Sequence, residues 1–364
     1  MDRVLVTGGA GFIGSCFVQY LLGRDSARQI LVLDKLTYAG HLCSLRSVAS
    51  HPSFEFVKGD IADRPLLNDL FTRFAPSAVI HFAVESHVDR SIDAPLDFVM
   101  TNVVGTAQLL EATRGYWDSL PPNRQSTFRF LHCSTDEVFG SLNSNGLFTE
   151  QSVYAPNSPY SASKAASDHF VRAYCQTYGL PVLTTHCANN FGPFQYPEKL
   201  IPLMILNAID ERSLPIYGDG QHIRDWLYVW DHCTALESVL FRGRAGESYN
   251  IGSQNERSNL EVVHAVCDAL ESLAPELFHR PLKDLIVHVE DRPGHDRRYG
   301  IDATKIRSEL GWEPAFSFET ALRETVAWYL QNRDWVEEVT RGNFDRQRLG
   351  VPIRNQTGTP KSTW

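Results

Sequence analysis

The 364-residue sequence lacks the features that mark secreted disulfide-rich proteins and zinc proteins. Its seven cysteines, at positions 16, 43, 133, 175, 187, 233 and 267, are scattered, odd in number and form no C-x-x-C pair. A disulfide framework or a zinc site needs regular cysteine spacing, so neither is indicated. The His-Cys dipeptides at 132, 186 and 232 are isolated, and we expect no metal. Reduced thiols in a cytoplasm are the simplest interpretation.

A surplus of positive charge and a long apolar run are also missing. Lys and Arg number 34 against 43 Asp and Glu, and the formal net charge is -9 at pH 7. Nucleic acids and anionic membranes are bound by basic faces, so we expect neither partner. The longest apolar stretch, near 200–209, contains a proline and is too short to span a bilayer. The chain opens directly into Val4-Leu5-Val6, so no signal peptide is expected.

Short β-branched runs alternate with longer helical stretches from residue 3 to about 190. We expect strands at 3–7, 29–34, 55–59, 78–82, 128–134 and 182–186, and helices after residue 11, after residue 65, over 102–114 and over 159–178. This alternation is typical of an α/β fold with a doubly wound parallel sheet, the Rossmann fold. The sequence therefore predicts a dinucleotide-binding domain over 1–190.

The sequence pattern changes beyond residue 190, where prolines and glycines become frequent and the segments with helix or strand periodicity become shorter. We expect a smaller C-terminal substrate-binding region over 191–335, with segments returning to the Rossmann domain. A helix is predicted over 317–332, because Leu322, Val326 and Tyr329 recur at helical spacing. The polar tail, 336–364, is expected to be mobile or to serve as an oligomer arm.

A glycine-patterned loop follows the first predicted strand and opens a helix. Gly8 permits a tight turn, Gly11 lets the backbone approach a pyrophosphate, and Gly14 allows close helix packing. Amide groups at the helix N-terminus favour an anion there. A glycine-rich turn without a ligand is the alternative, and the strand, glycines and following acid in register argue against it.

Acidic residues follow the second and third predicted strands. Asp34 stands where a carboxylate accepts hydrogen bonds from ribose hydroxyls and repels a 2′-phosphate, so NAD is favoured over NADP. Lys35 beside it weakens that preference slightly. Asp60 and Ile61 are placed to meet the adenine ring.

Tyr160 and Lys164 are four residues apart in a predicted helix and so share one face. An ammonium next to the phenol favours the phenolate, and we expect Tyr160 to be a usable base near neutral pH. Thr135, Asp136 and Glu137 follow the fifth strand, at the edge where doubly wound sheets bind ligands. Two acids can divide an elimination if their environments separate their pKa values. A turn or helix cap is the alternative role for the acid pair.

Motifs along nearly the whole chain, to about residue 335, resemble those of the nucleotide-sugar branch of the extended short-chain dehydrogenases, and specifically the dTDP-glucose 4,6-dehydratase family. The matching runs are 7–14, 36–40, 85–91, 134–140, 189–193, 197–202, 224–226 and 291–296. Four positions depart from the family pattern: His41, Val84, Phe139 and Ala188. None of these is a proposed acid or base.

The resemblance implies a cycle in which dTDP-glucose is oxidised at C4, loses water across C5 and C6, and regains the hydride at C6. Tyr160 would take the proton of the 4-hydroxyl, with Thr135 bonded to the same oxygen and NAD as hydride acceptor. Glu137 would remove the C5 proton, and Asp136 would protonate the departing 6-hydroxyl. The product would be dTDP-4-keto-6-deoxyglucose.

The resemblance also implies the residues that contact each ligand. Lys164 would touch the nicotinamide ribose, and the cofactor would also be lined by Phe12, Ile13, Lys35, Leu36, Thr37, Phe82, Ala83, Ser86, Thr101, Tyr160 and Asn190. The nucleotide-sugar pocket would be lined by Ser86, Thr135, Asn189, Lys199, Leu200, Pro215, Tyr217, Arg224, Asn259, Arg292 and His295. Lys199, Arg224 and Arg292 also fit physically, since a diphosphate bound to an acidic protein needs fixed cations. A homodimer through the 102–114 stretch and the Tyr160 helix is the family expectation.

Three other functions stay open. A UDP-hexose 4,6-dehydratase would need only small changes near 215–217. A nucleotide-sugar 4-epimerase shares the loop, the Tyr-Lys pair and NAD but needs no acid pair, so Asp136 and Glu137 discriminate against it. A catalytically silent NAD-binding scaffold would not need the five proposed catalytic residues.

Overall fold

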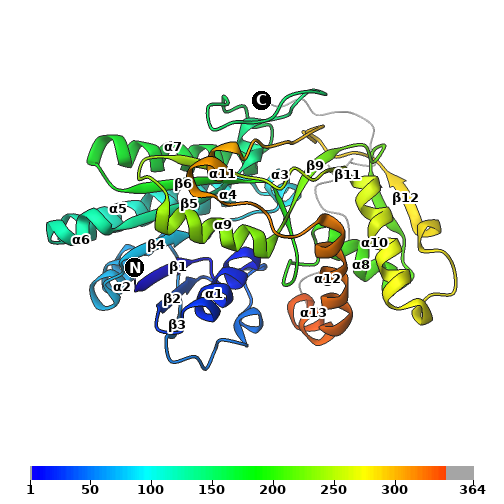
Figure 1. Ribbon diagram of the computed structural model, residues 1–364, viewed down its shortest axis with the longest axis horizontal. Helices are drawn as coiled ribbons and strands as arrows, with labels where there is room; N and C mark the ends of the chain where they lie inside the picture. Colours follow the sequence, from blue (N-terminus) through cyan, green and yellow to red (C-terminus); the bar gives the residue numbers. More distant parts are fainter. Residues whose placement is uncertain (1, 342–364) are drawn as a thin grey trace, which may run out of the picture.

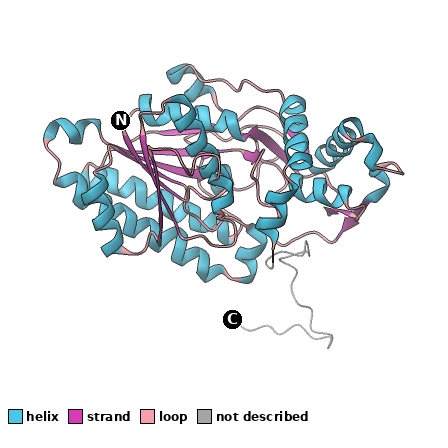
Figure 2. Ribbon diagram, turned by 90° about the horizontal axis from the view of Figure 1, so that it is seen from below, coloured by secondary structure: helices cyan, strands magenta, loops and turns pink. Residues whose placement is uncertain are grey.

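The computed structural model describes residues 2–341, and a seven-stranded parallel sheet forms its centre (Figure 1). The strand order is β10-β6-β5-β4-β1-β2-β3, and every pairing is parallel. Helices cover both sides of the sheet (Figure 2). The strands are β1 (Arg3–Thr7), β2 (Gln29–Asp34), β3 (Phe54–Lys58), β4 (Ala78–His81), β5 (Arg129–Thr135), β6 (Val182–Cys187) and β10 (Ser248–Ile251). The predicted doubly wound α/β fold is confirmed.

Successive side chains of each central strand enter different cores, because strand residues alternate between faces. Val4 and Val6 join one apolar cluster, whereas Leu5 joins the other. Helices α1 (Phe12–Arg24) and α9 (Val229–Arg242) pack together beside the first cluster. Helices α2 (Arg64–Phe74), α5 (Thr106–Asp118) and α7 (Pro159–Tyr178) belong to the second. A sheet buried on both faces can present polar ligand-binding side chains only at its ends.

The helices predicted in the first half of the chain are present, with one difference in form. The stretch expected as a single helix over 102–114 begins as a π-helix, Val99–Gly105, and continues as α5. Within the π-helix, the amide of Asn102 accepts from the Glu85 backbone N–H at 2.8 Å and donates to the Glu85 carbonyl at 3.0 Å. Short helices α3 (Val88–Asp93), α4 (Pro95–Phe98) and α6 (Pro122–Thr127) complete this half.

Most of the chain beyond residue 188, apart from α9, β10 and α11 (Thr304–Leu310), forms small sheets and helices at one end of the large sheet (Figure 1). One small sheet has the order β11-β9-β7, and the other pairs β12 with β8. The strands are β7 (Asn189–Phe191), β8 (Leu214–Tyr217), β9 (Ile223–Tyr228), β11 (Glu256–Ser258) and β12 (Ile286–Val289). The helices at this end are α8 (Leu200–Ile209), α10 (Asn259–Leu273), α12 (Phe318–Gln331) and α13 (Arg333–Thr340), whereas α11 packs against β10 and α9. Strand β10, which the sequence did not reveal, returns to pair with β6.

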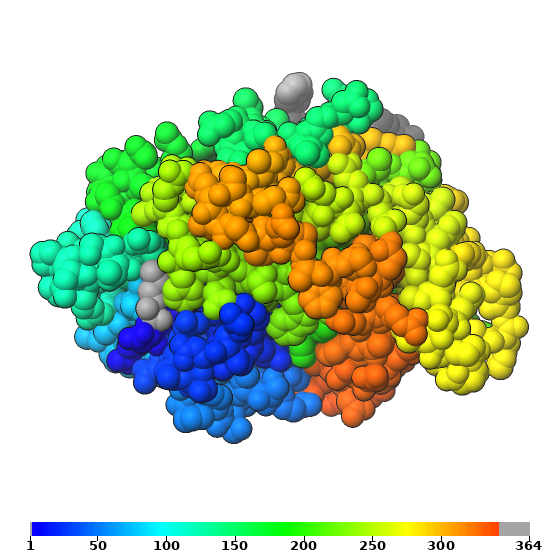
Figure 3. Space-filling view, viewed as in Figure 1, coloured from blue at the N-terminus to red at the C-terminus, as the bar shows by residue number. Residues whose placement is uncertain are grey.

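The C-terminal helices pack back onto the N-terminal segments. Figure 3 shows their surface, in orange, directly beside the blue surface of the N-terminal residues. Helix α12 confirms the predicted 317–332 helix, and Ser317 caps it by accepting from the Thr320 N–H. In α13, the indole of Trp335 donates to the Ser44 hydroxyl at 3.1 Å. Residues 342–364, most of the predicted tail, lie outside the described residues. In the described part of the chain, every helix is too short or too polar to cross a bilayer.

Candidate active site

The turn between β1 and α1 and the first turn of α1 each contain a position that only glycine can occupy. Gly8 has φ +72°, and a Cβ there would lie 2.4 Å from the backbone N of Ala83. A Cβ on Gly14 would lie 2.2 Å from the Gly8 carbonyl oxygen. The backbone therefore forms a close-packed cradle at the N-terminus of α1. Such a cradle, with free amide donors and the positive end of the helix dipole, suits a pyrophosphate.

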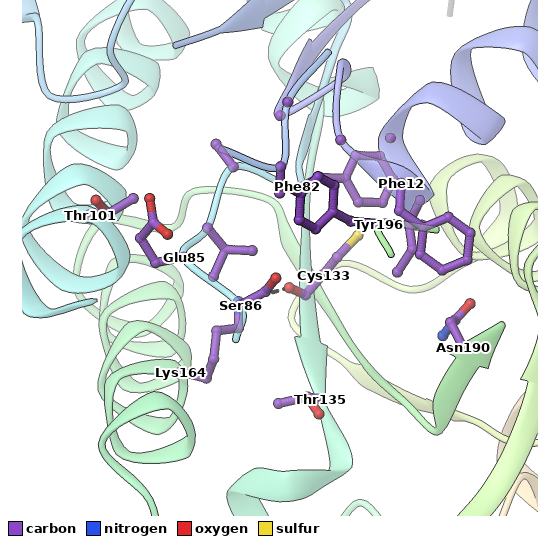
Figure 4. Close-up of a pocket in the computed structure, with 18 of the residues that line it drawn as sticks. Phe12, Phe82, Glu85, Ser86, Thr101, Cys133, Thr135, Lys164, Asn190 and Tyr196 are labelled. Carbon is purple, nitrogen blue, oxygen red and sulfur yellow. Dashed lines mark hydrogen bonds between the residues drawn. The ribbon is translucent and has the colours of Figure 1, made fainter. Parts of the chain in front are cut away.

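This cradle opens into a cavity of about 280 Å³ at the carboxyl ends of the central strands. The cavity brings together nearly all of the residues predicted to bind a dinucleotide. Its walls include Gly8, Gly11, Phe12, Ile13, Gly14, Asp34, Lys35, Thr37, Asp60, Ile61, Phe82, Ala83, Ser86, Thr101, Tyr160, Lys164 and Asn190. In Figure 4, Lys164 reaches into this space from α7 and Thr135 from β5, with Phe12 and Asn190 on the other side of the view.

Leu36 is the one predicted cofactor residue that does not line the cavity. It has φ +58°, and its backbone N–H donates to Asp34 Oδ1 at 2.8 Å. The Ala10 N–H donates to the other oxygen, Oδ2, at 2.9 Å. Asp34 thus fixes the glycine loop as well as facing the cavity. Lys35 forms an ion pair with Asp60 at 2.7 Å, so its charge is neutralised within the protein.

The end of β5 and the start of α7 place the five predicted catalytic residues on the same cavity: Thr135, Asp136, Glu137, Tyr160 and Lys164. Thr135 caps the 3₁₀ turn Asp136–Phe139, where its hydroxyl accepts from the Glu137 N–H at 3.3 Å. A capping box between Ser158 and Ser161 fixes the first turn of α7. Tyr160 is therefore in a well-defined turn rather than in a loop.

The two carboxyl groups have different surroundings. Burial raises the pKa of Asp136 well above its usual value, and the neighbouring Glu137 and Asp225 carboxylates raise it further. Burial also raises the pKa of Glu137, but the cations Arg292, Lys199 and Arg224 oppose this. Asp136 is thus held as the protonated acid, whereas Glu137 faces positive charge that favours its carboxylate. The predicted division of the elimination between these two acids requires different surroundings, and these contacts supply them.

The expectation that Lys164 makes Tyr160 acidic is not met in this structure. Burial raises the pKa of Tyr160 well above its usual value, and Glu137, Cys187 and Asp136 raise it further. Lys164 instead donates from Nζ to the Cys133 carbonyl oxygen at 2.9 Å, and burial lowers its pKa.

A second cavity, of about 220 Å³, adjoins the first and shares several wall residues with it, among them Glu137, Asn189 and Lys199. It collects most of the residues predicted to bind the nucleotide sugar. These are Asn189, Lys199, Leu200, Pro215, Tyr217, Arg224, Asn259, Arg292 and His295, while Ser86 and Thr135 line the first cavity. Glu137, one of the two acids of the predicted elimination, thus lies where the two cavities meet.

Three cations project toward the second cavity and are held by partners from distant parts of the chain. Arg224 donates to the carbonyl oxygens of Ile223 and Asp296, at 2.8 and 2.9 Å. Arg292 donates to Asp89 Oδ1 at 2.8 Å. Lys199 donates to the Ser86 carbonyl oxygen at 3.0 Å. Because two of the three are held by neutral carbonyl groups, this wall keeps positive charge for an anionic ligand.

His295 lines the same cavity but belongs to a small cluster of its own. Its Nδ1 lies 2.6 Å from Asp291 Oδ1, and its ring stacks on His222 at 3.6 Å between centroids. His222 Nε2 lies 3.2 Å from the other Asp291 oxygen. These three could hold a metal ion by their spacing. Burial, with Arg292 and Arg224 nearby, lowers the pKa of His295 to about 3, and the same positive charge disfavours a cation there.

The sequence missed two residues that organise these walls. Asp89 binds both Arg292 and the Tyr217 hydroxyl, the latter at 3.1 Å. Glu198 lines both cavities and accepts from Arg90 Nε at 3.1 Å. Both acids lie in runs that resemble the family, but their partners are far away in the sequence. Motif matching could identify Asp89 and Glu198 as family positions, but it could not show which residues they contact.

The four departures from the family pattern lie around the site rather than among the reacting groups. Val84 and Ala188 line the first cavity. His41 stacks on Tyr196 at 5.7 Å between ring centroids. Phe139 is buried among aromatic rings behind β5 and β6.

Comparison with known proteins agrees with this arrangement. A family model described as GDP-mannose 4,6 dehydratase matches residues 5–325. A dTDP-glucose 4,6-dehydratase of Xanthomonas campestris pv. campestris is 55% identical over 353 residues, which are 97% of this chain and 100% of that protein. The chain belongs to the dTDP-glucose 4,6-dehydratase family. The resemblance seen in the motifs is thereby confirmed.

Solved members of the dTDP-glucose 4,6-dehydratase family have the same fold. The enzyme of Bacillus anthracis in complex with NAD is 45% identical, with a TM-score of 0.83, over 93% of this chain and 100% of that one. The enzyme of Streptomyces venezuelae, also with NAD bound, is 46% identical, with a TM-score of 0.84, over 93% of this chain and 99% of that one.

We predict that Gly14→Ala loses bound NAD, because the added Cβ would lie 2.2 Å from the Gly8 carbonyl oxygen. Overpacking of this kind costs about 1–3 kcal/mol, so we expect roughly tenfold weaker NAD binding or more. The measurement is the amount of NAD retained per chain after purification. Gly23→Ala, in the same helix but with no atom within 4 Å of the new Cβ, is the control. Equal NAD content in the two variants would contradict the cradle.

Proposed function

We propose that this chain is an NAD-dependent hydro-lyase that converts dTDP-glucose to dTDP-4-keto-6-deoxyglucose. The observation that carries the proposal is the position of Glu137, which lines both the cavity of the glycine cradle and the cavity of the three cations. A 4-epimerase has no use for a buried acid pair at that junction. The relatives named dTDP-glucose 4,6-dehydratase support thymidine as the nucleoside of the substrate.

The residues of the first cavity suit NAD, because the close packing around Gly8 and Gly14 leaves a backbone cradle for its pyrophosphate. Asp34 faces the same cavity with a carboxylate that disfavours a 2′-phosphate. NAD, when bound, supplies an acceptor for a hydride during oxidation and a donor of that hydride at the end of the turnover. The protein groups then have to move protons only.

In the oxidation, Tyr160 takes the proton of the sugar 4-hydroxyl, with the Thr135 hydroxyl bonded to the same oxygen. Tyr160 can accept this proton only as a phenolate. Burial opposes that form, and the positive charges of Lys164 and of bound NAD, which share this cavity, would favour it. Lys164, held at the Cys133 carbonyl on the wall of the same cavity, would bind the nicotinamide ribose.

In the elimination, Glu137 takes the C5 proton, which the new 4-keto group has made acidic, and it returns a proton to C5 when C6 is reduced. Asp136, held protonated by its burial, gives its proton to the departing 6-hydroxyl, which leaves as water. The roles follow from the electrostatics, since the group facing Arg292, Lys199 and Arg224 is the one that can ionise. These same cations suit the diphosphate of the substrate.

We propose that residues 1–190 hold NAD and the catalytic groups, that 191–335 mainly hold the nucleotide sugar, and that 336–364 form a separate polar tail of the sequence. The two cavities support this division, because the first is lined mostly by the earlier residues and the second mostly by the later ones.

We further propose a cytoplasmic homodimer. The seven unpaired cysteines are consistent with a reducing compartment. Exposed apolar side chains, Leu96, Val99, Met100 and Phe170, lie on α4, the π-helix and α7, beside the helices expected to form the interface. Light scattering of the purified chain measures its oligomeric state.

Purified protein incubated separately with dTDP-glucose and UDP-glucose tests the function. We expect a 4-keto product from dTDP-glucose, without net consumption of NAD, and little from UDP-glucose. Faster turnover of UDP-glucose would show that uracil, and not thymine, is the preferred nucleobase. Interconversion of glucose and galactose nucleotides would indicate an epimerase. A protein that binds NAD but converts neither nucleotide would refute the proposal.

Glu137→Gln should stop the reaction after oxidation, because glutamine cannot accept the C5 proton. We expect the near-ultraviolet absorbance of NADH to appear on addition of dTDP-glucose and to persist. Asp136→Asn is the matched variant, which keeps the proposed C5 base and lacks the acid. Normal water elimination by Glu137→Gln would show that another group is the C5 base.

Arg292→Gln should move the acid limb of the pH profile of kcat/KM to higher pH. Glu137 must be ionised to act as a base, its pKa is raised by burial, and Arg292 is the first of the cations that lower it. Loss of the Arg292 cation raises the pKa of Glu137. On acidification, activity is therefore lost at a pH about one unit higher than in the unaltered chain. Arg297→Gln removes an exposed arginine bonded to Asp219 and should leave the limb in place. An unmoved limb in Arg292→Gln would mean that Glu137 is not the titrating group.

A further inference from the structure

Asp168 is a buried carboxylate on α7 that the proposed reaction does not use. Only 4% of its surface is exposed, and four side chains surround its two oxygens. On β5, His132 Nε2 lies 3.0 Å from Oδ1, and the Ser134 hydroxyl donates to Oδ2 at 2.8 Å. The Tyr154 hydroxyl donates to Oδ2 at 3.0 Å, and His186 Nε2 on β6 lies 3.2 Å from it. One carboxylate therefore ties the catalytic helix to two central strands and to the segment before that helix.

The hydrogen bonds identify the charge state of this cluster. The Nδ1 atoms of His132 and His186 have no partner among the described residues, and both Nε2 atoms face the carboxylate. The Nε2 atom of each ring therefore donates to the carboxylate, and burial lowers the pKa of His132 to about 4, so that imidazole is neutral. Burial alone would raise the pKa of Asp168, but hydrogen bonds from the two histidines hold it far below its usual value. Asp168 is an ionised carboxylate.

Lys164 stands four residues before Asp168, on the same face of α7. Its Nζ donates to the carbonyl oxygen of Cys133 at 2.9 Å. Cys133 lies between His132 and Ser134, the two β5 residues bonded to Asp168. Helix α7 is thus attached twice to the same three residues of β5.

These attachments lie next to the reacting groups. Tyr160 is one helical turn before Lys164, and Thr135 directly follows Ser134. A shift of α7 along β5 would change the distance between the phenol and the acids that follow Thr135. Misplacement by about 1 Å can cost about 100-fold in rate.

The negative charge of Asp168 also affects Lys164. Burial lowers the pKa of Lys164, and Asp168 is the first of the charges that raise it again. The other titratable groups near Lys164 and Asp168 come from three strands of the sheet and from the segment before α7. They are His81 on β4, His132 and Cys133 on β5, His186 and Cys187 on β6, and Tyr154 before α7.

We propose that Asp168 is a positioning residue, which keeps Lys164 charged at the Cys133 carbonyl and sets Tyr160 over the end of β5. The proposal rests on the proposed function for its kinetic readout.

Asp168→Asn tests it, because asparagine keeps the size of the side chain but removes the charge. We expect kcat to fall at least tenfold while the KM for dTDP-glucose changes less than threefold. Without the carboxylate, Lys164 loses its proton at lower pH. We therefore expect the alkaline limb of the kcat/KM profile to move down by about one pH unit.

Tyr154→Phe separates position from charge, since it removes one hydrogen bond and leaves the carboxylate ionised. We expect a several-fold fall in kcat with no downward movement of the alkaline limb. Tyr228→Phe is the matched control, because it removes a hydroxyl that donates to Glu324 at 2.9 Å, away from both cavities. We expect it to leave both readouts unchanged.

Two results would overturn the proposal. One is a folded Asp168→Asn protein with kcat within twofold of the unaltered chain and an unmoved alkaline limb. The other is a Tyr154→Phe protein indistinguishable from Tyr228→Phe, and this comparison decides the matter if Asp168→Asn does not fold.

Failure of the proposed function has a different signature, namely that the unaltered chain converts neither nucleotide sugar. In that case the pH dependence of NAD retention tests Asp168 alone, since Lys164 lines the NAD cavity. If half of the NAD is lost at a pH about one unit lower in Asp168→Asn than in the unaltered chain, the proposal is supported. An unchanged midpoint pH would refute it.

Discussion

The central constraint on this molecule is a parallel sheet buried on both faces. Its strands can expose polar groups only where they end, and β1, β2, β4, β5 and β6 all end at the wall of one cavity. The glycine cradle, the acids after β5 and the amides after β6 therefore meet although they are far apart in the sequence. The chain passes directly from β6 into β7, so the second cavity begins where the first one ends. Because the two cavities are continuous, Glu137 lines both of them.

At the junction, burial and charge have opposite effects on two adjacent carboxyl groups. Burial favours the neutral form of both Asp136 and Glu137. Arginine and lysine side chains from β9, the 291–296 run and the start of α8 then act most strongly on Glu137. The cations that suit a diphosphate thus also help to assign the acid and the base. A neutral wall in the second cavity would weaken substrate binding and proton abstraction together.

Much of the site could be predicted from local sequence because its chemistry depends on local geometry. Gly8 and Gly14 could be recognised because a strand-turn-helix unit that holds a phosphate leaves no room for a Cβ. Tyr160 and Lys164 could be paired because four residues make about one helical turn. Other contacts could not be found in this way, since Asp89 acts on Arg292, and Asp168 on His132, across long stretches of chain. The contact of Lys164 with the Cys133 carbonyl could not be predicted for the same reason, because a backbone carbonyl on another element carries no side-chain signature.

By itself, the sequence determined the six strands with strong apolar runs, the glycine cradle, most of the residues predicted to line the two cavities, and the family. Those features depend on hydrophobic periodicity, on backbone sterics and on short motifs, all of which act within a few residues. Only the tertiary structure decided that four-residue β10 joins the large sheet beside β6, and that Leu36 turns its amide to Asp34 instead of lining the cavity. It also decided which of two neighbouring acids ionises, because pKa values depend on burial and on charges that folding brings from elsewhere in the chain.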